Sequence, residues 1–92
     1  MCKKETYKLI QNSLGGRILE YSLVEENMLS KKDTFYGIKL TLKSKKINEE
    51  VIINRISKEK TVVKNLLEYL YENSIDTIHF KDIVDDYMSL IN

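Results

Sequence analysis

The sequence predicts an α+β fold, in which a three-stranded antiparallel β-meander is covered on one face by two C-terminal helices. Hydrophobic residues alternate with polar ones between residues 17 and 56, which is the period of half-buried strands. After Ser57 the spacing changes to that of amphipathic helices, and strands followed by helices indicate α+β. The 92 residues, 42% hydrophobic, suffice for one small domain. We divide them into an N-terminal segment, 1–16, and a single α+β domain, 17–92.

The N-terminal segment is predicted to be a short helix or an arm. Gly15 and Gly16 form the clearest break in the sequence, because residues without a Cβ suit helix ends and sharp turns. Before this pair, Tyr7, Ile10 and Leu14 recur at helical spacing and favour one or two amphipathic turns. An extended, partly mobile arm is the alternative.

Three segments have the pattern of strands. The clearest is 34–43, in which Tyr36, Ile38, Leu40 and Leu42 point one way and Lys39, Thr41 and Lys43 the other. A similar alternation runs through 17–25. The third segment, 50–56, is more uniformly apolar, which indicates fuller burial or a central position in the sheet. Polar residues 26–33 and 44–49 form the loop and the turn between them. The predicted inward faces are Leu19, Tyr21 and Leu23, followed by Tyr36, Ile38, Leu40 and Leu42.

Two helices are predicted after the strands. The first has an N-cap at Ser57 and ends near Asn73, where Asn73 and Ser74 make a polar stop. The second begins after Asp76 or Thr77. Their core-facing stripes are Val62, Val63, Leu66, Leu67 and Leu70 in the first helix, and Phe80, Ile83, Val84, Tyr87, Met88 and Ile91 in the second.

Charge and cysteine content indicate the cellular compartment of the protein but do not identify a binding partner. The net charge is +1, but residues 1–64 carry +6 and residues 65–92 carry −5. The only cysteine, Cys2, allows no intramolecular disulfide. The longest apolar run, 51–53, is far shorter than the roughly 20 residues of a membrane-spanning helix. We therefore expect a cytoplasmic protein without a secretory signal.

Few residues could support catalysis. The chain has one histidine, one cysteine and no glycine-rich phosphate loop, so we predict that it is not an enzyme and needs no cofactor. His79, Asp82 and Asp86 stand at i, i+3 and i+7 and could meet a divalent metal on one helical face. A metal needs ligands from a second element, and no other histidine or cysteine offers them. We therefore predict no metal site there.

A row of lysines is the candidate nucleic-acid interface. Lys39 and Lys43 project from the polar face of the predicted second strand, and Lys45 and Lys46 extend the row through the turn. Such a row can neutralise phosphates. The exposed aromatic residues that stack on bases are missing, because Tyr36 faces the core. Lysines at these positions also protect a sheet from edge pairing, which is the competing interpretation.

Tyrosines and acidic residues of the C-terminal part are the candidates for protein binding. Tyr69 and Tyr71 cannot both share the core face of their helix, so at least one reaches the surface, where tyrosine is enriched in interfaces. Asp82, Asp85 and Asp86 form an acidic patch on the last helix. A solvated helix face is the simpler interpretation of these acids.

Much of the chain resembles a known family. The strand beginning Y-G-I-K-L, the helix V-V-K-N-L-L-E-Y-L-Y-E-N and the tail I-H-F-K-D-I-V-D-D-Y-M are similar to small uncharacterised proteins. These occur in low-GC Gram-positive, mostly spore-forming anaerobic bacteria. The similarity extends from about Tyr21 to Met88 and includes a motif from His79 to Tyr87. Relatives often carry a proline where this chain has residues 76–78. The resemblance implies a bacterial or bacteriophage origin and brings no activity.

Two main hypotheses for the function follow. The first is a non-enzymatic protein-interaction or regulatory module, whose exposed sheet edges a homodimer would cover. The second is a phage-type inhibitor from a mobile element, which docks on a nucleic-acid-handling host complex or binds nucleic acid through the lysine row. A metal-dependent function at His79 and Asp82 is a third and weaker alternative.

Overall fold

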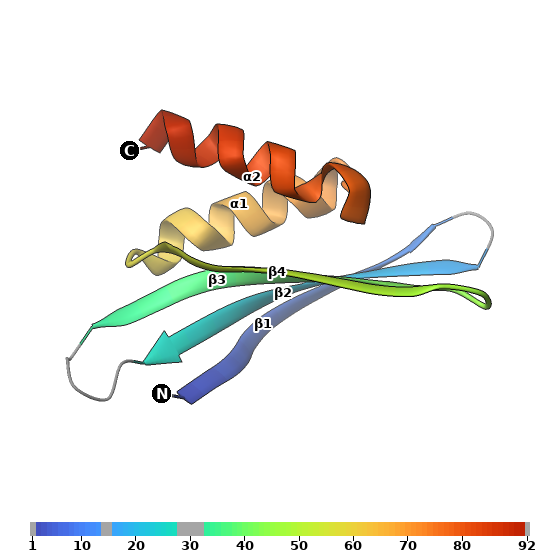
Figure 1. The fold of residues 1–92 in the computed structure, drawn as a ribbon, viewed down its shortest axis with the longest axis horizontal. Coiled ribbons are helices and arrows are strands. Elements are labelled where there is room, and N and C mark those ends of the chain that lie inside the picture. Colours follow the sequence, from blue (N-terminus) through green and yellow to red (C-terminus); the bar gives the residue numbers. More distant parts are fainter. Residues whose placement is uncertain (1, 14–15, 28–32, 92) are drawn as a thin grey trace.

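Four consecutive strands form one antiparallel sheet, and the two helices that follow pack on one of its faces (Figure 1). The computed structural model describes residues 2–13, 16–27 and 33–91. The strands lie in chain order, and each pairs antiparallel with the next. The elements are β1 (Cys2–Ser13), β2 (Arg17–Asn27), β3 (Thr34–Lys43), β4 (Asn48–Ser57), α1 (Lys60–Glu72) and α2 (Thr77–Ile91).

The N-terminal segment is a strand of this sheet, so the predicted short helix is wrong and the sheet has four strands, not three. β1 pairs with β2 from end to end, with one register shift between Glu5 and Tyr7. Tyr7 and Leu9 pack against the core, whereas Ile10 is 54% exposed on the opposite face. The period of two therefore prevails over the helical spacing, because β2 offers backbone partners along the segment. Leu14 lies outside the described residues.

The two central strands confirm their predicted pattern. β3 has the predicted bounds, and its inward residues Ile38, Leu40 and Leu42 are buried. β2 continues beyond the predicted end at Glu25 to Asn27, since its pairing with both neighbours continues that far. The predicted loop after β2 is therefore shorter, and most of it lies outside the described residues.

β4 is an edge strand, which corrects the prediction of a central position. Among the strands that the structure describes, it pairs with β3 alone, and Ile52 is 45% exposed on the face away from the helices. Val51 and Ile53 are partly buried against the core from the other face. The uniform apolar run thus covers both sides of an edge, which composition alone does not distinguish from a central strand.

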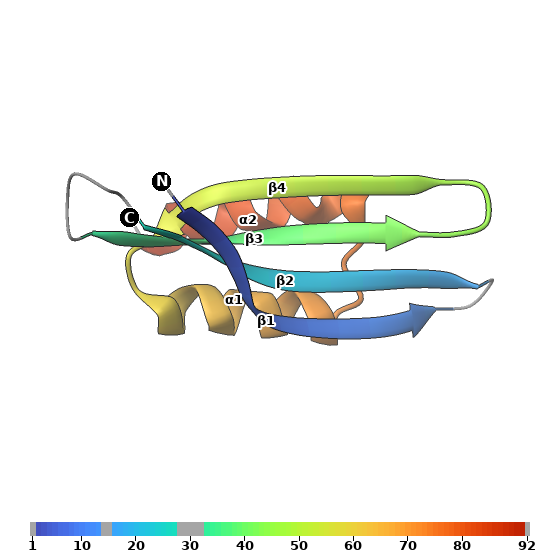
Figure 2. The same ribbon diagram turned by 90° about the horizontal axis from the view of Figure 1, so that it is seen from below.

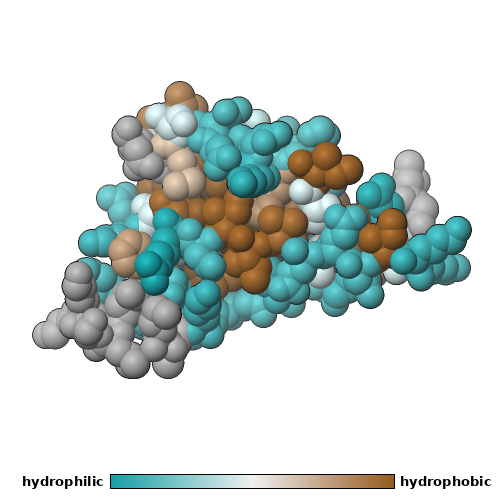
Figure 3. All heavy atoms as spheres, in the orientation of Figure 1, coloured by the Kyte–Doolittle hydropathy of each residue, from teal (hydrophilic) through white to brown (hydrophobic). Residues whose placement is uncertain are grey.

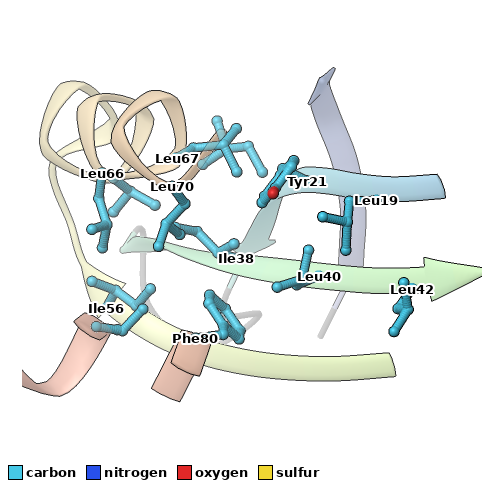
Figure 4. Packing of buried hydrophobic residues seen from close by; sticks show 13 residues of the cluster. Leu19, Tyr21, Ile38, Leu40, Leu42, Ile56, Leu66, Leu67, Leu70 and Phe80 are labelled. Atoms are coloured by element: carbon cyan, nitrogen blue, oxygen red, sulfur yellow. The ribbon is translucent and has the colours of Figure 1, made fainter. Parts of the chain in front are cut away.

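The hydrophobic core lies between the sheet and the helices. Figure 2 shows α1 behind the β1–β2 side of the sheet and α2 behind the β3–β4 side, so the helices lie next to each other in one layer. Figure 4 shows side chains of β2 and β3 directed toward α1 and α2. The core residues are Leu19, Tyr21, Leu23, Ile38, Leu40, Leu42, Ile56, Val63, Leu66, Leu67, Leu70, Phe80 and Val84.

A tight turn connects the helices and makes them antiparallel. Ser74 has a left-handed φ of 51°, and its N–H donates to the carbonyl oxygen of Tyr71 at 3.2 Å. The N–H of Ile75 donates to the carbonyl oxygen of Leu70 at 3.0 Å. This pair of bonds is the Schellman pattern, which satisfies the last carbonyls of α1. Because the helix ends so abruptly, α2 starts only a few residues later.

The helix starts differ from each other. α2 begins where the sequence predicts, because Asp76 Oδ1 accepts hydrogen bonds from the N–H groups of Ile78 (3.1 Å) and His79 (3.2 Å). The predicted N-cap of α1 is wrong: Ser57 is the last residue of β4, and α1 begins at Lys60.

Candidate functional site

A surface groove of about 480 Å³ lies between α1 and α2 and is lined mainly by apolar surface. Tyr69 is 51% exposed and Leu90 is 85% exposed, although both are large hydrophobic side chains. We call this feature the α1–α2 groove. It is lined by Asn65 and Tyr69 from α1 and by Ile83, Asp86, Tyr87 and Leu90 from α2.

The groove exists because each helix packs its most apolar stripe on the sheet. In α1 the buried residues, which include Leu66 and Leu70, face the strands. Asn65 and Tyr69, one turn apart, lie beside that stripe and line the groove. α1 packs mainly on β2 and β3, whereas α2 packs on β3 and β4, and a groove remains between the two helices. Apolar side chains therefore remain partly exposed between them.

The structure brings together two of the predicted protein-binding residues and separates the others. Tyr69 and Asp86 line the α1–α2 groove from opposite helices. Asp82 and Asp85 are exposed on α2 and do not line the groove. Tyr71 is partly buried on the sheet side of α1. The prediction that at least one of the two tyrosines reaches the surface is confirmed by Tyr69.

Tyr71 belongs to a buried tyrosine pair beneath α1. Its ring meets the ring of Tyr21 edge to face, with centroids 5.9 Å apart. The Tyr21 hydroxyl donates to the carbonyl oxygen of Ile75 at 2.9 Å. Burial, together with the nearby Asp76 carboxylate, raises the pKa of Tyr21 to about 12. The pair therefore fixes the helix turn to β2, which is a structural role.

The α1–α2 groove lies in the acidic part of the molecule. Residues 65–92 contain one cation, Lys81, and six acidic residues. Asp86 stands in the groove itself, and Glu72 follows Tyr69 by one helical turn on the same side of α1. The groove thus combines an apolar floor with negative charge beside it.

The lysine row is not a continuous cationic surface. Lys39 Nζ lies 3.3 Å from a carboxylate oxygen of Glu5. Lys43 Nζ lies 3.4 Å from Glu20 Oε1. Two of the four lysines are therefore paired across strands on the open face of the sheet, the face without helices. Lys45 and Lys46 are exposed in the turn between β3 and β4.

The candidate metal ligands of α2 are all exposed. His79 stands in the first turn of the helix, and Asp82 and Asp86 follow on its surface. Within residues 2–13, 16–27 and 33–91, no group of three or more histidine, cysteine, aspartate or glutamate side chains could hold a metal ion. The geometry therefore offers these three residues no second element with which to share an ion.

Sequence reasoning missed a polar cluster on the open face. Glu26 is buried and accepts a hydrogen bond from Arg55 Nε at 3.2 Å, while the guanidinium lies 5.8 Å from the ring centre of Phe35. Hydrogen bonds from Arg55 lower the pKa of Glu26. The cluster joins β2, β3 and β4. Its signal in the sequence is weak, because Glu26 falls where a loop is predicted.

Comparison with known proteins gives one match. A model of a family of unknown function, DUF6514, matches residues 3–90. The chain belongs to this family. No curated protein and no solved structure is significantly similar to it. This match confirms the predicted resemblance to a family of uncharacterised proteins. The origin of the DUF6514 protein in Gram-positive anaerobes remains a prediction.

The helices of the DUF6514 protein give one further fact about membranes. In the parts of the chain that the structure describes, neither helix has the length and hydrophobicity to cross a bilayer. The cytoplasmic localisation stays a prediction.

Proposed function

We propose that the protein is a non-enzymatic interaction module that binds a basic, amphipathic helix of a partner protein in the α1–α2 groove. The observation that carries this proposal is the groove itself, because exposed apolar side chains and a carboxylate line one hollow between two helices. A third helix laid between two others is a recurring mode of peptide recognition.

The apolar lining fits the anchor residues of such a helix. Ile83, Tyr87 and Leu90 follow one another along one side of α2, over about 10 Å at the helical rise. Tyr69 faces them from α1. A partner helix with apolar residues at i, i+3 or i+4, and i+7 matches this length. Exposed tyrosines in such a position supply much contact area for little loss of side-chain freedom.

The charge beside the groove determines the kind of partner. With a net charge of −5 over residues 65–92, this half of the molecule attracts a cationic segment and repels an anionic one. Asp86 lines the groove and is the nearest acceptor for a lysine or arginine flanking the apolar anchors. We therefore assign a basic rather than an acidic partner helix.

Nucleic acid binding through the lysine row has less support. Lys39 and Lys43 already have carboxylate partners, Glu5 and Glu20, on the open face of the sheet. A phosphate would have to displace these carboxylates or bind beside them, which weakens the attraction. The remaining pair, Lys45 and Lys46, provides two contacts only.

The test uses designed helical peptides as probes. Three peptides of about 14 residues share one apolar face and carry lysine and arginine, glutamate, or serine on the other. Fluorescence anisotropy measures their affinities for the full chain. We expect the basic amphipathic peptide to bind about tenfold or more tightly than the acidic peptide. A fourth peptide, basic but without the apolar face, should bind weakly.

Matched variants on α2 locate the binding. Asp86→Lys and Asp85→Lys make the same charge change on neighbouring exposed residues, but only Asp86 lines the groove. We expect Asp86→Lys and Leu90→Glu to reduce affinity for the basic peptide about tenfold, and Asp85→Lys to reduce it much less. Equal losses in both lysine variants would mean non-specific attraction. Equal affinity for all peptides would contradict the proposal.

A further inference from the structure

The two edges of the sheet differ in how well they are protected. β1 carries Lys3, Lys4 and Lys8 and has a register shift after Glu5, which are features that prevent an edge from pairing with another chain. β4 has no charged residue within 51–53, and it pairs with β3 without interruption from Asn48 to Ile53. Its own register shift, at the left-handed Arg55, comes only after this stretch. The regular, uncharged segment 51–53 is therefore where β4 is open to pairing.

The unprotected edge is apolar on both sides. Ile52 is 45% exposed on the open face of the sheet. Val51 and Ile53 point to the other face, where they are partly buried against the core. Figure 3 views the molecule from the side of β4 and α2 and shows hydrophobic side chains gathered between the helix layer and the sheet. Pairing at this edge would cover this apolar strip as well as the backbone.

The backbone N–H and C=O groups of Ile52 point toward the exposed edge of β4, where they can pair with another strand. The N–H of Ser44 donates to the carbonyl oxygen of Ile47 at 2.9 Å, which makes these two residues a hydrogen-bonded pair of the β3–β4 hairpin. Hydrogen-bonded pairs alternate along an antiparallel ladder. The polar backbone groups of Glu50 and Ile52 consequently point away from β3 and toward the exposed edge.

We propose that β4 pairs antiparallel with β4 of a second copy of this chain, about a two-fold axis at Ile52. This register places Ile52 beside its own copy and Val51 opposite Ile53. It also brings Glu50 to the level of Asn54 of the second copy, where the register shift of β4 begins and Arg55 follows. Centring the axis on Val51 would instead set Glu50 against Ile52, and a shift by one residue would place side chains on the wrong faces.

Charge favours a second copy as the occupant. Glu49 and Glu50 lie near the start of β4 and Arg55 lies near its end, so antiparallel self-pairing brings the acidic part of each strand toward the basic part of the other. Arg55 reaches across the open face, to which Glu50 also belongs. Parallel pairing in register would place like charges together. The dimer has an eight-stranded sheet, with the α1–α2 groove on each copy left open, so this proposal does not depend on the proposed function.

Matched substitutions at the two edges test the proposal. Ile52 on β4 and Ile10 on β1 are exposed to similar degrees, 45% and 54%. Sedimentation equilibrium of the full chain, up to about 100 μM, should show a dimer. We expect Ile52→Lys to raise the dissociation constant about tenfold or more and Ile10→Lys to leave it nearly unchanged. A monomeric wild-type protein, or an equal effect of both variants, would overturn the proposal.

Cross-linking tests the register without relying on a charged substitution. In a Cys2→Ser background, Ile52→Cys places two thiols across the two-fold axis, where the Cα atoms of a hydrogen-bonded pair lie about 5.5 Å apart. This spacing suits a disulfide. With oxidised glutathione as the oxidant, we expect a covalent dimer from Ile52→Cys and none from Ile10→Cys. A dimer of wild-type protein without cross-linking at residue 52 would overturn the register, and cross-linking of Ile10→Cys would overturn the choice of edge.

Discussion

The two faces of the sheet use the same strands in opposite ways. On the face covered by the helices, Ile38, Leu40 and Leu42 of β3 are buried among apolar side chains. On the open face, Lys39 and Lys43 from the same strand pair with carboxylates of β1 and β2. A buried leucine contributes about 2 kcal/mol or more, whereas a surface ion pair contributes about 0–1 kcal/mol. Residues on the covered face therefore contribute most of the free energy of unfolding, and the ion pairs of the open face contribute little.

The largest expected loss of stability comes from truncating a buried side chain on the covered face. Leu40 is fully buried at the centre of β3, and Leu40→Ala should lower the free energy of unfolding by about 2–5 kcal/mol through lost burial and a cavity. Thr41→Val, one residue along on the open face, should change it by less than about 0.5 kcal/mol. Urea unfolding measures both, and comparable losses would contradict the division between the faces.

A smaller loss is expected where the open face is closely packed by backbone. A Cβ at Gly37 would clash with the carbonyl oxygen of Ile53 and lie 2.9 Å from the Cα of Asn54. Gly37→Ala should therefore lower the free energy of unfolding by about 1–3 kcal/mol. Nothing lies within 4 Å of a Cβ at Gly16, whose φ is +76°. Since asparagine tolerates this backbone, Gly16→Asn serves as the milder control. If both substitutions had the same cost, the close approach at Gly37 would not be the cause.

The tyrosine on the covered face should make stability depend on alkaline pH. Tyr21 has its pKa raised from 10.0 to about 12, so the folded state holds the phenol proton more tightly than the unfolded state. The free energy of unfolding should consequently fall as pH rises from about 10 to about 12. Tyr21→Phe should lose about 1 kcal/mol at neutral pH with the bond to Ile75, and it should lack this part of the alkaline decline.

Urea unfolding at several pH values between neutral and pH 11 separates these effects. Tyr69→Phe is the matched control, because Tyr69 is half exposed and lies on the groove side of α1. An unchanged pH profile in Tyr21→Phe would contradict the role assigned to the buried hydroxyl.

The smallest effect is expected from the charge pairs of the open face. The Ser22 hydroxyl and Lys39 lower the pKa of Glu5, so its carboxylate stabilises the folded state above its unfolded pKa, and this contribution is lost as pH falls through the folded value. Glu5→Gln should lower the free energy of unfolding by less than about 1 kcal/mol at neutral pH. The difference should shrink between about 0.01 M and about 1 M salt, as measured by urea unfolding, because salt screens exposed charges. A large loss that does not depend on salt would contradict the interpretation of this pair as a weak, exposed ion pair.

Sequence reasoning succeeded where one period dominated the pattern. In β3 apolar residues alternate with polar ones from Ile38 to Lys43, so the strand and its buried face were predictable. In β1, Tyr7 and Leu9 support a strand while Tyr7 and Ile10 support a helix, and pairing with β2 decides between them. The candidate residues Tyr69 and Asp86 were predictable as surface groups, but their convergence on one groove depends on how far apart the helices lie.

The sequence by itself determined the order of strands and helices after residue 17, the inward face of β3 and the separation of basic and acidic halves, because these follow from local periodicity and composition. The tertiary structure decided the rest. It placed β4 at an edge, since a meander in chain order gives its last strand only one strand neighbour. It paired Lys39 with Glu5, and it left Ile83, Tyr87 and Leu90 beside an open groove, because contacts between distant segments depend on register and on helix placement.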